Sequence, residues 1–522
     1  MNRRGKLVAL AAAAGCLIAV PVTLAAHDAG PLLPGRNGHH HGHHRMSAGH
    51  RPASPRAAAA RGPATVLLGG PVRPVPGSYL GLSFEYWGMP LFERHLTAFA
   101  RVLSLLHVPG DGPLMLRVGG DSADRSLWDP GVRQLPQWVF RLAPRWLEST
   151  NALLRRAAVR LILDLNLVTA SPLRAAAWAQ AAETGLRRGS IAAFEIGNEP
   201  DIYDRRYWLA TITRAGQGPA VLPTAISAQS YVGDFGAYAR ALGGFAPAVP
   251  LMGPAVANPI RSRSWISLLA ARARSRLGAL TAHRYPYSAC YGRASAVFPT
   301  IARVLSERAS AGTAQVVRPA AQIAHRAGLP FRMTELNSVT CGGRPGVSNS
   351  FATALWAPDA LFELMRAGVD GVNVHVRADT VNAAMIPAAG GLRERPLLLG
   401  LILFDRTLAA GGRLLSTTVQ APGAALKVWG VQTSRSQRRL LLINKGQRAL
   451  RVRLRIPAAG TAKVERLLAP AVSATTGETL GGRWLGPDGR WRGRPTRERL
   501  QPGADGYALA VPAASAALVS IG

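Results

Sequence analysis

Lysine is almost missing from this chain of 522 residues. It occurs only at Lys6, Lys427, Lys445 and Lys463, so arginine supplies nearly all of a formal net charge of +34. This skew, with abundant Ala, Gly and Pro, is typical of proteins encoded by GC-rich genomes. The arginines are also scattered, whereas a nucleic-acid footprint clusters on one face or helix. We therefore expect no nucleic-acid partner, while attraction to polyanionic polysaccharide or an anionic envelope stays open.

Long apolar runs are absent after residue 30, so no internal membrane span is expected. The N-terminus does contain one, at residues 7–26, preceded by Arg3, Arg4 and Lys6. This pattern predicts an export signal over residues 1–26 and hence a secreted or envelope-associated protein. Two alternatives are an uncleaved N-terminal membrane anchor and a lipoprotein box at Cys16, although the residues after Cys16 are apolar where a lipoprotein turns polar.

Residues 27–62 show no apolar period and are rich in Pro, Gly, Ala, His and Arg, which predicts a disordered tether. The tether contains a histidine run: His39, His40, His41, His43 and His44. Because the run lacks the fixed ligand spacing of a structured metal site, an incidental solvated tract is the favoured interpretation, and no metal site is predicted.

From residue 79 onward, short β-rich runs alternate with amphipathic helical stretches. The eight strand candidates are residues 79–86, 114–120, 160–167, 191–200, 250–257, 279–288, 331–338 and 369–376. Helices are predicted at 92–106, 265–278, 351–368 and 397–410. Eight strands each followed by a helix predict an α/β fold, the (β/α)8 TIM barrel, over residues 63–411. A doubly wound sheet would carry a glycine-rich loop after its first strand, and here Glu85, Tyr86 and Trp87 stand there instead.

After about residue 412 the helical period disappears. Residues 438–446, 448–456, 462–468 and 506–522 have the pattern of short antiparallel strands divided by Gly and Pro turns. They predict a C-terminal antiparallel β-sandwich domain over residues 412–522. Residues 65–75, ahead of the barrel, are candidates for an additional strand of that sandwich.

Two predicted barrel strands end in glutamate. The fourth is followed by Asn198, Glu199 and Pro200, and the seventh ends at Thr334 and Glu335. Charged groups at the ends of buried strands are costly unless they have a use, and active sites of such barrels lie at the C-terminal strand ends. Two carboxyls facing each other across the barrel mouth fit glycoside cleavage. The alternative is a pair of helix-capping acids at strand–helix junctions.

The sequence around both glutamates resembles a known family. GNEP after the fourth strand and TE at the end of the seventh are similar to the signature of clan A retaining glycosidases. Within that clan, residues 65–522 resemble glycoside hydrolase family 79, the heparanase and β-glucuronidase family. The stretches that carry the resemblance are GLSFEYWG, LRVGGDSADRSLWDP, FEIGNEPD, HRYPYSAC, TELNSVTCGGRPGVSNSFATALWAPD, TGETLGGRW and VPAASAALVSI.

The resemblance implies roles for individual residues. It makes Glu199 the general acid/base and Glu335 the nucleophile, with Asn198 holding the sugar 2-hydroxyl and Tyr285 donating a hydrogen bond to the nucleophile. A phenol donor at that position keeps Glu335 ionised while Glu199 stays protonated.

Substrate contacts are also implied by the resemblance. Glu85 and Asp121 match positions near the hydroxyls at the non-reducing end of the bound sugar, although each could be only an ion-pair partner at the barrel mouth.

The family's carboxylate-binding elements are only partly present. Its glucuronidases hold the uronate with backbone amides of the loop after the nucleophile and with tyrosines. This chain keeps Gly342 and Gly343 but has Thr340 where a tyrosine is expected. Instead, His375 and Arg377 end the eighth strand, and an arginine can bind a carboxylate bidentately. Arg377 could equally be one more surface arginine.

Cysteine is scarce, with three residues. Removal of the export signal would leave Cys290 and Cys341, and an even count in an exported chain suggests pairing. The two residues lie in loops after adjacent strands, five residues past Tyr285 and six past Glu335, so a disulfide between them is predicted.

Together these patterns predict a retaining exo-β-glycoside hydrolase, with β-glucuronidase activity on glucuronides or acidic glycans. No cofactor and no metal are expected, because two carboxyls suffice. The first alternative is a clan A β-glycosidase for a neutral sugar. The second is a non-catalytic envelope protein that binds acidic polysaccharide.

Overall fold

The computed structural model describes residues 63–522, apart from 132–133, 136–137, 204–226, 247 and 457–459. The predicted export signal, tether and histidine run lie outside the described residues. Among the residues that are described, no helix is both long and apolar enough to span a membrane.

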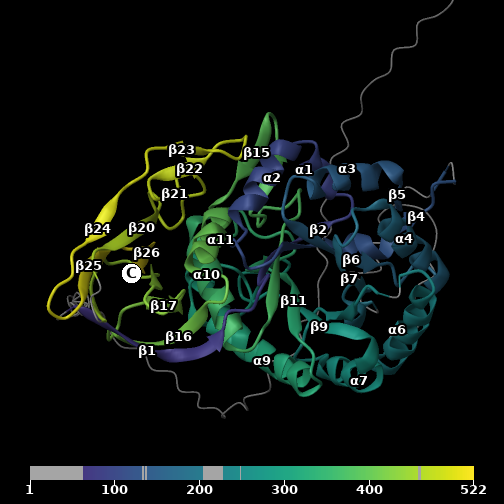
Figure 1. The fold of residues 1–522 in the computed structure, drawn as a ribbon, viewed down its shortest axis with the longest axis horizontal. Helices are drawn as coiled ribbons and strands as arrows, with labels where there is room; N and C mark the ends of the chain where they lie inside the picture. Colours follow the sequence, from purple (N-terminus) through teal and green to yellow (C-terminus); the bar gives the residue numbers. More distant parts are fainter. Residues whose placement is uncertain (1–62, 132–133, 136–137, 204–226, 247, 457–459) are drawn as a thin grey trace, which may run out of the picture. The chain divides into compact units, whose positions relative to one another are not determined.

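Eight parallel strands close into a barrel in the order β11-β13-β2-β3-β6-β7-β8-β9 (Figure 1). Their bounds are β2 (Leu80–Glu85), β3 (Leu114–Gly119), β6 (Val159–Leu165), β7 (Ile191–Ile196), β8 (Leu251–Val256), β9 (Leu277–Arg284), β11 (Phe331–Leu336) and β13 (Gly371–His375). Every one lies within or beside a predicted strand, and the predicted (β/α)8 fold is confirmed. Near-continuous burial along these strands explains why they appear in the sequence as short apolar runs.

Helices surround the barrel, as the alternating pattern predicted. They are α1 (Met89–Glu93), α2 (Leu96–Leu105), α3 (Pro144–Leu154), α4 (Pro172–Gly185), α6 (Ala228–Gly243), α7 (Arg263–Ala273), α8 (Ile301–Val304), α9 (Ala311–Arg326), α10 (Phe351–Arg366) and α11 (Pro396–Thr407). Short 3₁₀ turns are η1 (Gly120–Arg125), η2 (Pro200–Ile202), η3 (Arg274–Arg276) and η4 (Glu307–Ala309).

Three predicted boundaries were wrong. The single helix expected at 92–106 is divided into α1 and α2, because His95 has a non-helical backbone (φ −108°, ψ 41°). The helix expected at 265–278 ends earlier, since Leu277 and Gly278 already belong to β9, which pairs with β8. The strand expected at 279–288 ends at Arg284 and is followed by the separate strand β10 (Tyr287–Ser288).

The second sheet has twelve strands and is mostly antiparallel. It comprises β1 (Ala64–Pro74), β16 (Arg413–Gln420), β17 (Leu426–Gln432), β18 (Arg438–Asn444), β19 (Leu450–Arg455), β20 (Ala462–Leu468), β21 (Thr479–Leu480), β22 (Arg483–Leu485), β23 (Trp491–Gly493), β24 (Glu498–Leu500), β25 (Tyr507–Val511) and β26 (Ser515–Ile521). β1, N-terminal to the barrel, pairs antiparallel with β16 and parallel with β19. The sequence had predicted an antiparallel domain, and the sheet is antiparallel except for this parallel β1–β19 pair.

Helix α10 connects the barrel to this sheet through buried polar and aromatic contacts. The buried carboxylate of Asp359 accepts a hydrogen bond from Trp429 at 2.9 Å and pairs with Lys445 at 2.5 Å. Phe362 stacks on the Trp429 ring with centroids 5.3 Å apart. Removal of either charged partner would leave an uncompensated charge in the interior, so the packing of α10 on the sheet depends on both Asp359 and Lys445.

Three two-stranded sheets, called ribbons below, lie outside the eight barrel strands. They are β4 (Ser126–Trp128) with β5 (Phe140–Leu142), β10 with β12 (Val339–Thr340), and β14 (Met385–Ala388) with β15 (Gly391–Glu394). The β10–β12 ribbon joins the loops that follow β9 and β11, so these two loops act as one unit at the C-terminal end of the barrel.

Candidate active site

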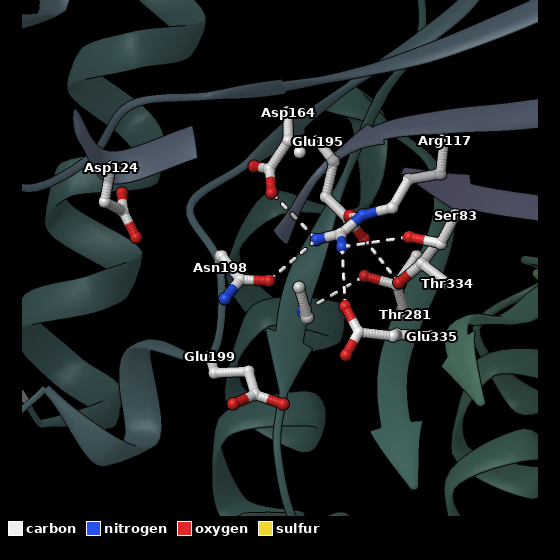
Figure 2. A network of polar contacts seen from close by, with 12 residues as sticks. Ser83, Arg117, Asp124, Asp164, Glu195, Asn198, Glu199, Thr281, Thr334 and Glu335 are labelled. Carbon is white, nitrogen blue, oxygen red and sulfur yellow. Dashed lines mark hydrogen bonds and ion pairs between the residues drawn. The ribbon is translucent and has the colours of Figure 1, made fainter. Parts of the chain in front are cut away.

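The two glutamates singled out in the sequence lie together at the C-terminal ends of the barrel strands. Glu335 is in β11, and Glu199 follows β7 by three residues. One carboxylate oxygen of each lies within 4.8 Å of the other, with a ring nitrogen of His283 inside the same distance. Figure 2 shows both side chains at the same end of the barrel.

Glu199 is held in an unusual backbone conformation. Its φ of 52° and ψ of 50° place it in the left-handed region, which costs a residue with a Cβ roughly 1 kcal/mol or more. Its N–H donates to the carbonyl of Ala255 at 3.0 Å, which ties the turn after β7 to β8. Such strain is retained where the fold needs a side chain at one particular place.

The turn after Glu199 is fixed by Asp201. Its carboxylate accepts the backbone N–H groups of Ala257 and Asn258, and the Ser262 hydroxyl at 2.6 Å. Asp201, two residues after Glu199, therefore has a structural role in holding this turn.

Glu335 is surrounded by donors. The Tyr285 hydroxyl donates a short hydrogen bond to its Oε1, and Nη1 of Arg117 lies 3.1 Å from its Oε2. The same tyrosine oxygen lies 2.8 Å from Nδ1 of His375. Both oxygens of Glu335 thus already have a positively polarised partner.

The two carboxyls have opposite pKa shifts. Burial, and then the negative charge of Glu335, raises the pKa of Glu199 well above its usual value. Burial also opposes ionisation of Glu335, but the charges of His375 and Arg117 and the hydrogen bond from Tyr285 outweigh it and lower the pKa of Glu335 below its usual value. The two shifts favour a protonated Glu199 beside an ionised Glu335.

His283 contacts Glu199 rather than Glu335. Its Nδ1 lies 3.0 Å from Oε1 of Glu199, and the ring is fully buried in β9. Burial lowers the pKa of His283 to about 4, so the ring is neutral and can form a hydrogen bond, but not an ion pair, with Glu199. The sequence pattern did not predict this contact. Periodicity along a strand indicates only that a residue such as His283 is buried in the barrel, and it does not identify the residue that it contacts there.

Arg117 organises the centre of the barrel, and the sequence analysis did not identify it. Its guanidinium pairs with Glu195 at 2.8 Å and Asp164 at 2.7 Å, besides Glu335 (Figure 2). The available signal was a charged residue in each of the mostly apolar strands β3, β6 and β7, namely Arg117, Asp164 and Glu195. Buried ions in such strands require partners, and here they partner one another.

Asn198 is oriented by the same arginine. Nη2 of Arg117 donates to Oδ1 of Asn198 at 3.0 Å, and the Tyr203 hydroxyl lies 3.2 Å from the Asn198 backbone nitrogen. Since an arginine can only donate, the asparagine must offer its oxygen to Arg117, which leaves its amide N–H groups as donors toward the mouth. Tyr203 is itself anchored, because its hydroxyl donates to Asp124 at 2.5 Å.

Four further residues singled out in the sequence, Glu85, Asp121, His375 and Arg377, form a charged cluster beside Glu199 and Glu335. Nη1 of Arg377 lies 3.9 Å from Glu85 and 3.6 Å from Asp121, and its Nε pairs with Asp379 at 2.8 Å. Nε2 of His375 lies 3.8 Å from Glu85. Arg377 is thus already surrounded by three carboxylates, two of which were predicted to bind sugar hydroxyls.

The two glycines in the loop after Glu335 both have a left-handed backbone, with φ of 74° at Gly342 and 83° at Gly343. A Cβ at Gly343 would lie under 3 Å from atoms of Ser348 and Asn382. The Gly343 N–H already donates to the carbonyl of Thr340 at 3.3 Å. These glycines therefore shape a tight turn, and one of the two amides proposed to bind a carboxylate has a partner within the chain.

Cys290 and Cys341 form a disulfide with their Cα atoms 5.8 Å apart. The pairing that the cysteine count predicted is confirmed. The bridge lies beside the β10–β12 ribbon and joins the loop after β9 to the loop after β11.

The cluster of Glu199, His283 and Glu335 has a ligand set that could also hold a metal ion. Its surroundings suit a cation poorly. Both oxygens of Glu335 accept hydrogen bonds, and the positive charge of Arg117 lies 3.1 Å away. Repulsion from that charge opposes a divalent cation at this position.

Comparison with known proteins yields structural matches only. No protein-family model matches the chain, and no curated protein matches its sequence. A 4-O-α-L-rhamnosyl-β-D-glucuronidase from Fusarium oxysporum 12S is 17% identical with a TM-score of 0.67, over 88% of this chain and 100% of the other. The GH51 arabinofuranosidase from Xanthomonas axonopodis pv. citri is 14% identical with a TM-score of 0.62, over the same shares.

The catalytic domain of GH30 xylanase C from Talaromyces cellulolyticus is a more distant match, 11% identical with a TM-score of 0.52, over 88% of this chain and 100% of the other. At such identities these likenesses establish the fold. The barrel with an attached β domain is therefore shared with glycosidases of several substrate specificities.

Proposed function

We propose that this protein is a retaining exo-β-glycoside hydrolase, with Glu335 as nucleophile and Glu199 as general acid/base. The observation that carries the proposal is the pair of carboxylate oxygens within 4.8 Å of each other. Retaining enzymes keep their carboxyls about 5–5.5 Å apart, whereas inverting enzymes need roughly 6.5–9.5 Å to admit a water molecule.

The opposite pKa shifts supply the two protonation states that the reaction needs. In the first step ionised Glu335 attacks the anomeric carbon while Glu199 gives its proton to the departing glycosidic oxygen. A covalent glycosyl–enzyme ester and a free alcohol result. In the second step Glu199, now ionised, takes a proton from water, and the hydroxide displaces Glu335 with overall retention.

Arg117 and Asn198 position the sugar in this proposal. The free amide N–H of Asn198 would bind the 2-hydroxyl, a contact that strengthens in an oxocarbenium-like transition state. The guanidinium of Arg117 orients the side-chain amide of Asn198 and also favours the ionised form of Glu335. Preorganised donors of this kind act mainly by electrostatic stabilisation.

We propose glucuronides, simple or within acidic glycans, as substrates. His375 supports this choice: burial opposes its protonation, but Glu335 and Glu85 raise the pKa of His375 and so favour a cation beside the sugar site. The likeness to the Fusarium glucuronidase makes glucuronides the first compounds to assay.

A second candidate is a neutral β-glycoside. The observation that favours it is the charge around Arg377, whose three acidic neighbours leave little net attraction for a substrate carboxylate.

A panel of aryl glycosides tests the proposal. Aryl β-glucuronide, β-glucoside, β-galactoside and their α-anomers should be assayed with the wild-type protein and with Glu335→Gln. Hydrolysis of a β-glycoside that disappears in the variant supports a glycosidase, and methanolysis analysed by NMR reports the anomeric configuration of the product. Binding of acidic polysaccharide without turnover of any member would favour the non-catalytic alternative instead.

We also propose that the protein acts outside the cytoplasm. The disulfide beside the site and the apolar N-terminus predicted as an export signal both support this location.

A further inference from the structure

A pocket of about 370 Å³ lies away from the catalytic pair, in the loops that follow β9 and β11. Five residues line it: Arg293, Phe298, Thr300, Arg303 and Arg344. Three of the five are arginines, and the proposed reaction uses none of them.

Two of these arginines are held in place by the backbone around them. Nη1 of Arg303 donates to the carbonyls of Ser295 at 2.8 Å and Phe298 at 2.7 Å. Nη1 of Arg344 donates to the carbonyl of Pro299 at 2.9 Å, and its guanidinium lies 4.3 Å from the centroid of the Phe298 ring. Fixed guanidinium groups lose little conformational entropy when they bind a ligand.

None of the three arginines forms an ion pair with a described acidic side chain, in contrast to Arg117 and Arg377 in the catalytic site. The bonds that hold Arg303 and Arg344 go to carbonyl oxygens, which leave the positive charge uncompensated. Like charges that line one pocket repel each other, and an anion between them removes that repulsion. The Thr300 hydroxyl adds a neutral donor to the same wall.

The pocket is attached to the catalytic site through covalent and backbone connections. Cys341 lies three residues before Arg344, and its disulfide with Cys290 joins the two pocket loops. Arg344 follows Glu335 by nine residues, a stretch that spans at most about 30 Å even when extended. A glycan of a few sugar units can therefore reach from one site to the other.

We propose that this pocket binds an oxyanion, a sulfate or a carboxylate, carried by a part of the substrate other than the sugar that is cleaved off. Arginine forks match the geometry of both groups. The role as a substrate subsite depends on the proposed glycosidase function, but binding of the anion does not. The inference defines the substrate class as an acidic glycan whose second anion lies away from the catalytic pair.

Arg293→Glu is the test variant, since Arg293 is exposed and its side chain holds no part of the loop. Arg272→Glu is the matched control: it makes the same charge change on the exposed face of α7, outside the pocket. Equal thermal unfolding of the two variants shows that the fold is intact. The substrates are β-glucuronosyl oligosaccharides of increasing length with one sulfate on a sugar of the leaving part, the same series with a uronic acid at that place, and the uncharged parents.

We expect Arg293→Glu to lower kcat/KM by roughly tenfold or more for at least one of the charged oligosaccharides long enough to reach the pocket, as loss of a charge-assisted contact requires. The uncharged parents should change less than twofold, and Arg272→Glu should change none of them. The charged substrate that is affected distinguishes a sulfate site from a carboxylate site. Equal effects of the two variants, or no effect of Arg293→Glu on either charged series, would overturn the inference while leaving the glycosidase function in place.

A binding measurement separates this inference from the proposed function. Dissociation constants of the same oligosaccharides, measured by calorimetry in the Glu335→Gln background, need no turnover. Weaker binding of a charged oligosaccharide in Arg293→Glu but not in Arg272→Glu supports the pocket, even if the wild-type protein hydrolyses nothing. Absence of binding, or equal weakening in both variants, overturns it.

Discussion

The Tyr285 hydroxyl donates a short hydrogen bond to the carboxylate of Glu335, and a disulfide joins the loop that begins at Tyr285 to the loop that follows Glu335 and β11. Because this bond stabilises the ionised carboxylate, Tyr285→Phe should raise the pKa of Glu335 and shift the acidic limb of the rate profile to higher pH. Loss of a hydrogen bond to a charged group should lower kcat roughly tenfold to a hundredfold.

Tyr287→Phe is the control for this variant. It removes a hydroxyl from a tyrosine two residues away whose partner is Ser306, at 3.1 Å. Steady-state kinetics over a pH series, with both variants beside the wild type, measures the effect. Equal losses in the two variants would show that the effect comes from packing of the loop.

Glu335→Gln should abolish turnover with the fold intact, because a neutral amide cannot attack the anomeric carbon. The variant should also lower the pKa of Glu199, since the charge of Glu335 is, after burial, the largest cause of its elevation. Carboxyl titration by ¹³C NMR in the variant and wild type measures this shift. An unchanged pKa of Glu199 would contradict the electrostatic coupling described above.

The pH profile of kcat/KM should be bell-shaped. Activity rises as pH passes the lowered pKa of Glu335, because the nucleophile must be ionised. It falls as pH passes the raised pKa of Glu199, because the general acid must be protonated. Both limbs lying between pH 4 and 5, the usual carboxyl range, would contradict the assignment of two opposed environments.

The Cys290–Cys341 bridge should stabilise the native state. It closes a loop with a sequence separation of 51, for which the chain-entropy model gives about 4 kcal/mol as an upper value. The double variant Cys290→Ser/Cys341→Ser should therefore unfold at lower urea concentration, with an m-value equal to or larger than that of the wild type because its unfolded chain is less constrained. Detection of two titratable thiols from these positions in the unfolded, non-reduced wild type would instead show that the bridge does not form.

Substrate charge should separate the two candidate specificities. If His375, Arg377 or the Gly342 and Gly343 amides hold a uronate, glucuronide should exceed glucoside by roughly a hundredfold or more in kcat/KM. A competition assay with the paired aryl substrates measures the ratio. Equal rates would reject the glucuronidase and leave the neutral glycosidase.

Sequence by itself determined the barrel and its two acidic strand ends. Eight buried parallel strands appear in the sequence as eight short apolar runs. Glu199 and Glu335 stand out because a charge is costly at the end of a buried strand. The cysteine pair followed from their offsets to those strands, since loops after neighbouring strands lie side by side. Strand β1 was recognisable only as an option, because its partners β16 and β19 are more than 300 residues away.

Tertiary structure alone decided what surrounds these residues. Arg117, Asp164 and Glu195 stand on the neighbouring strands β3, β6 and β7, and only the pairing of these strands brings their charges within 3 Å. The tertiary fold also places His283 against Glu199 and brings Glu85 and Asp121 to Arg377, which no spacing within one segment encodes. Periodicity specifies which face of a strand is buried, but the partner of a buried charge depends on the packing of the whole barrel.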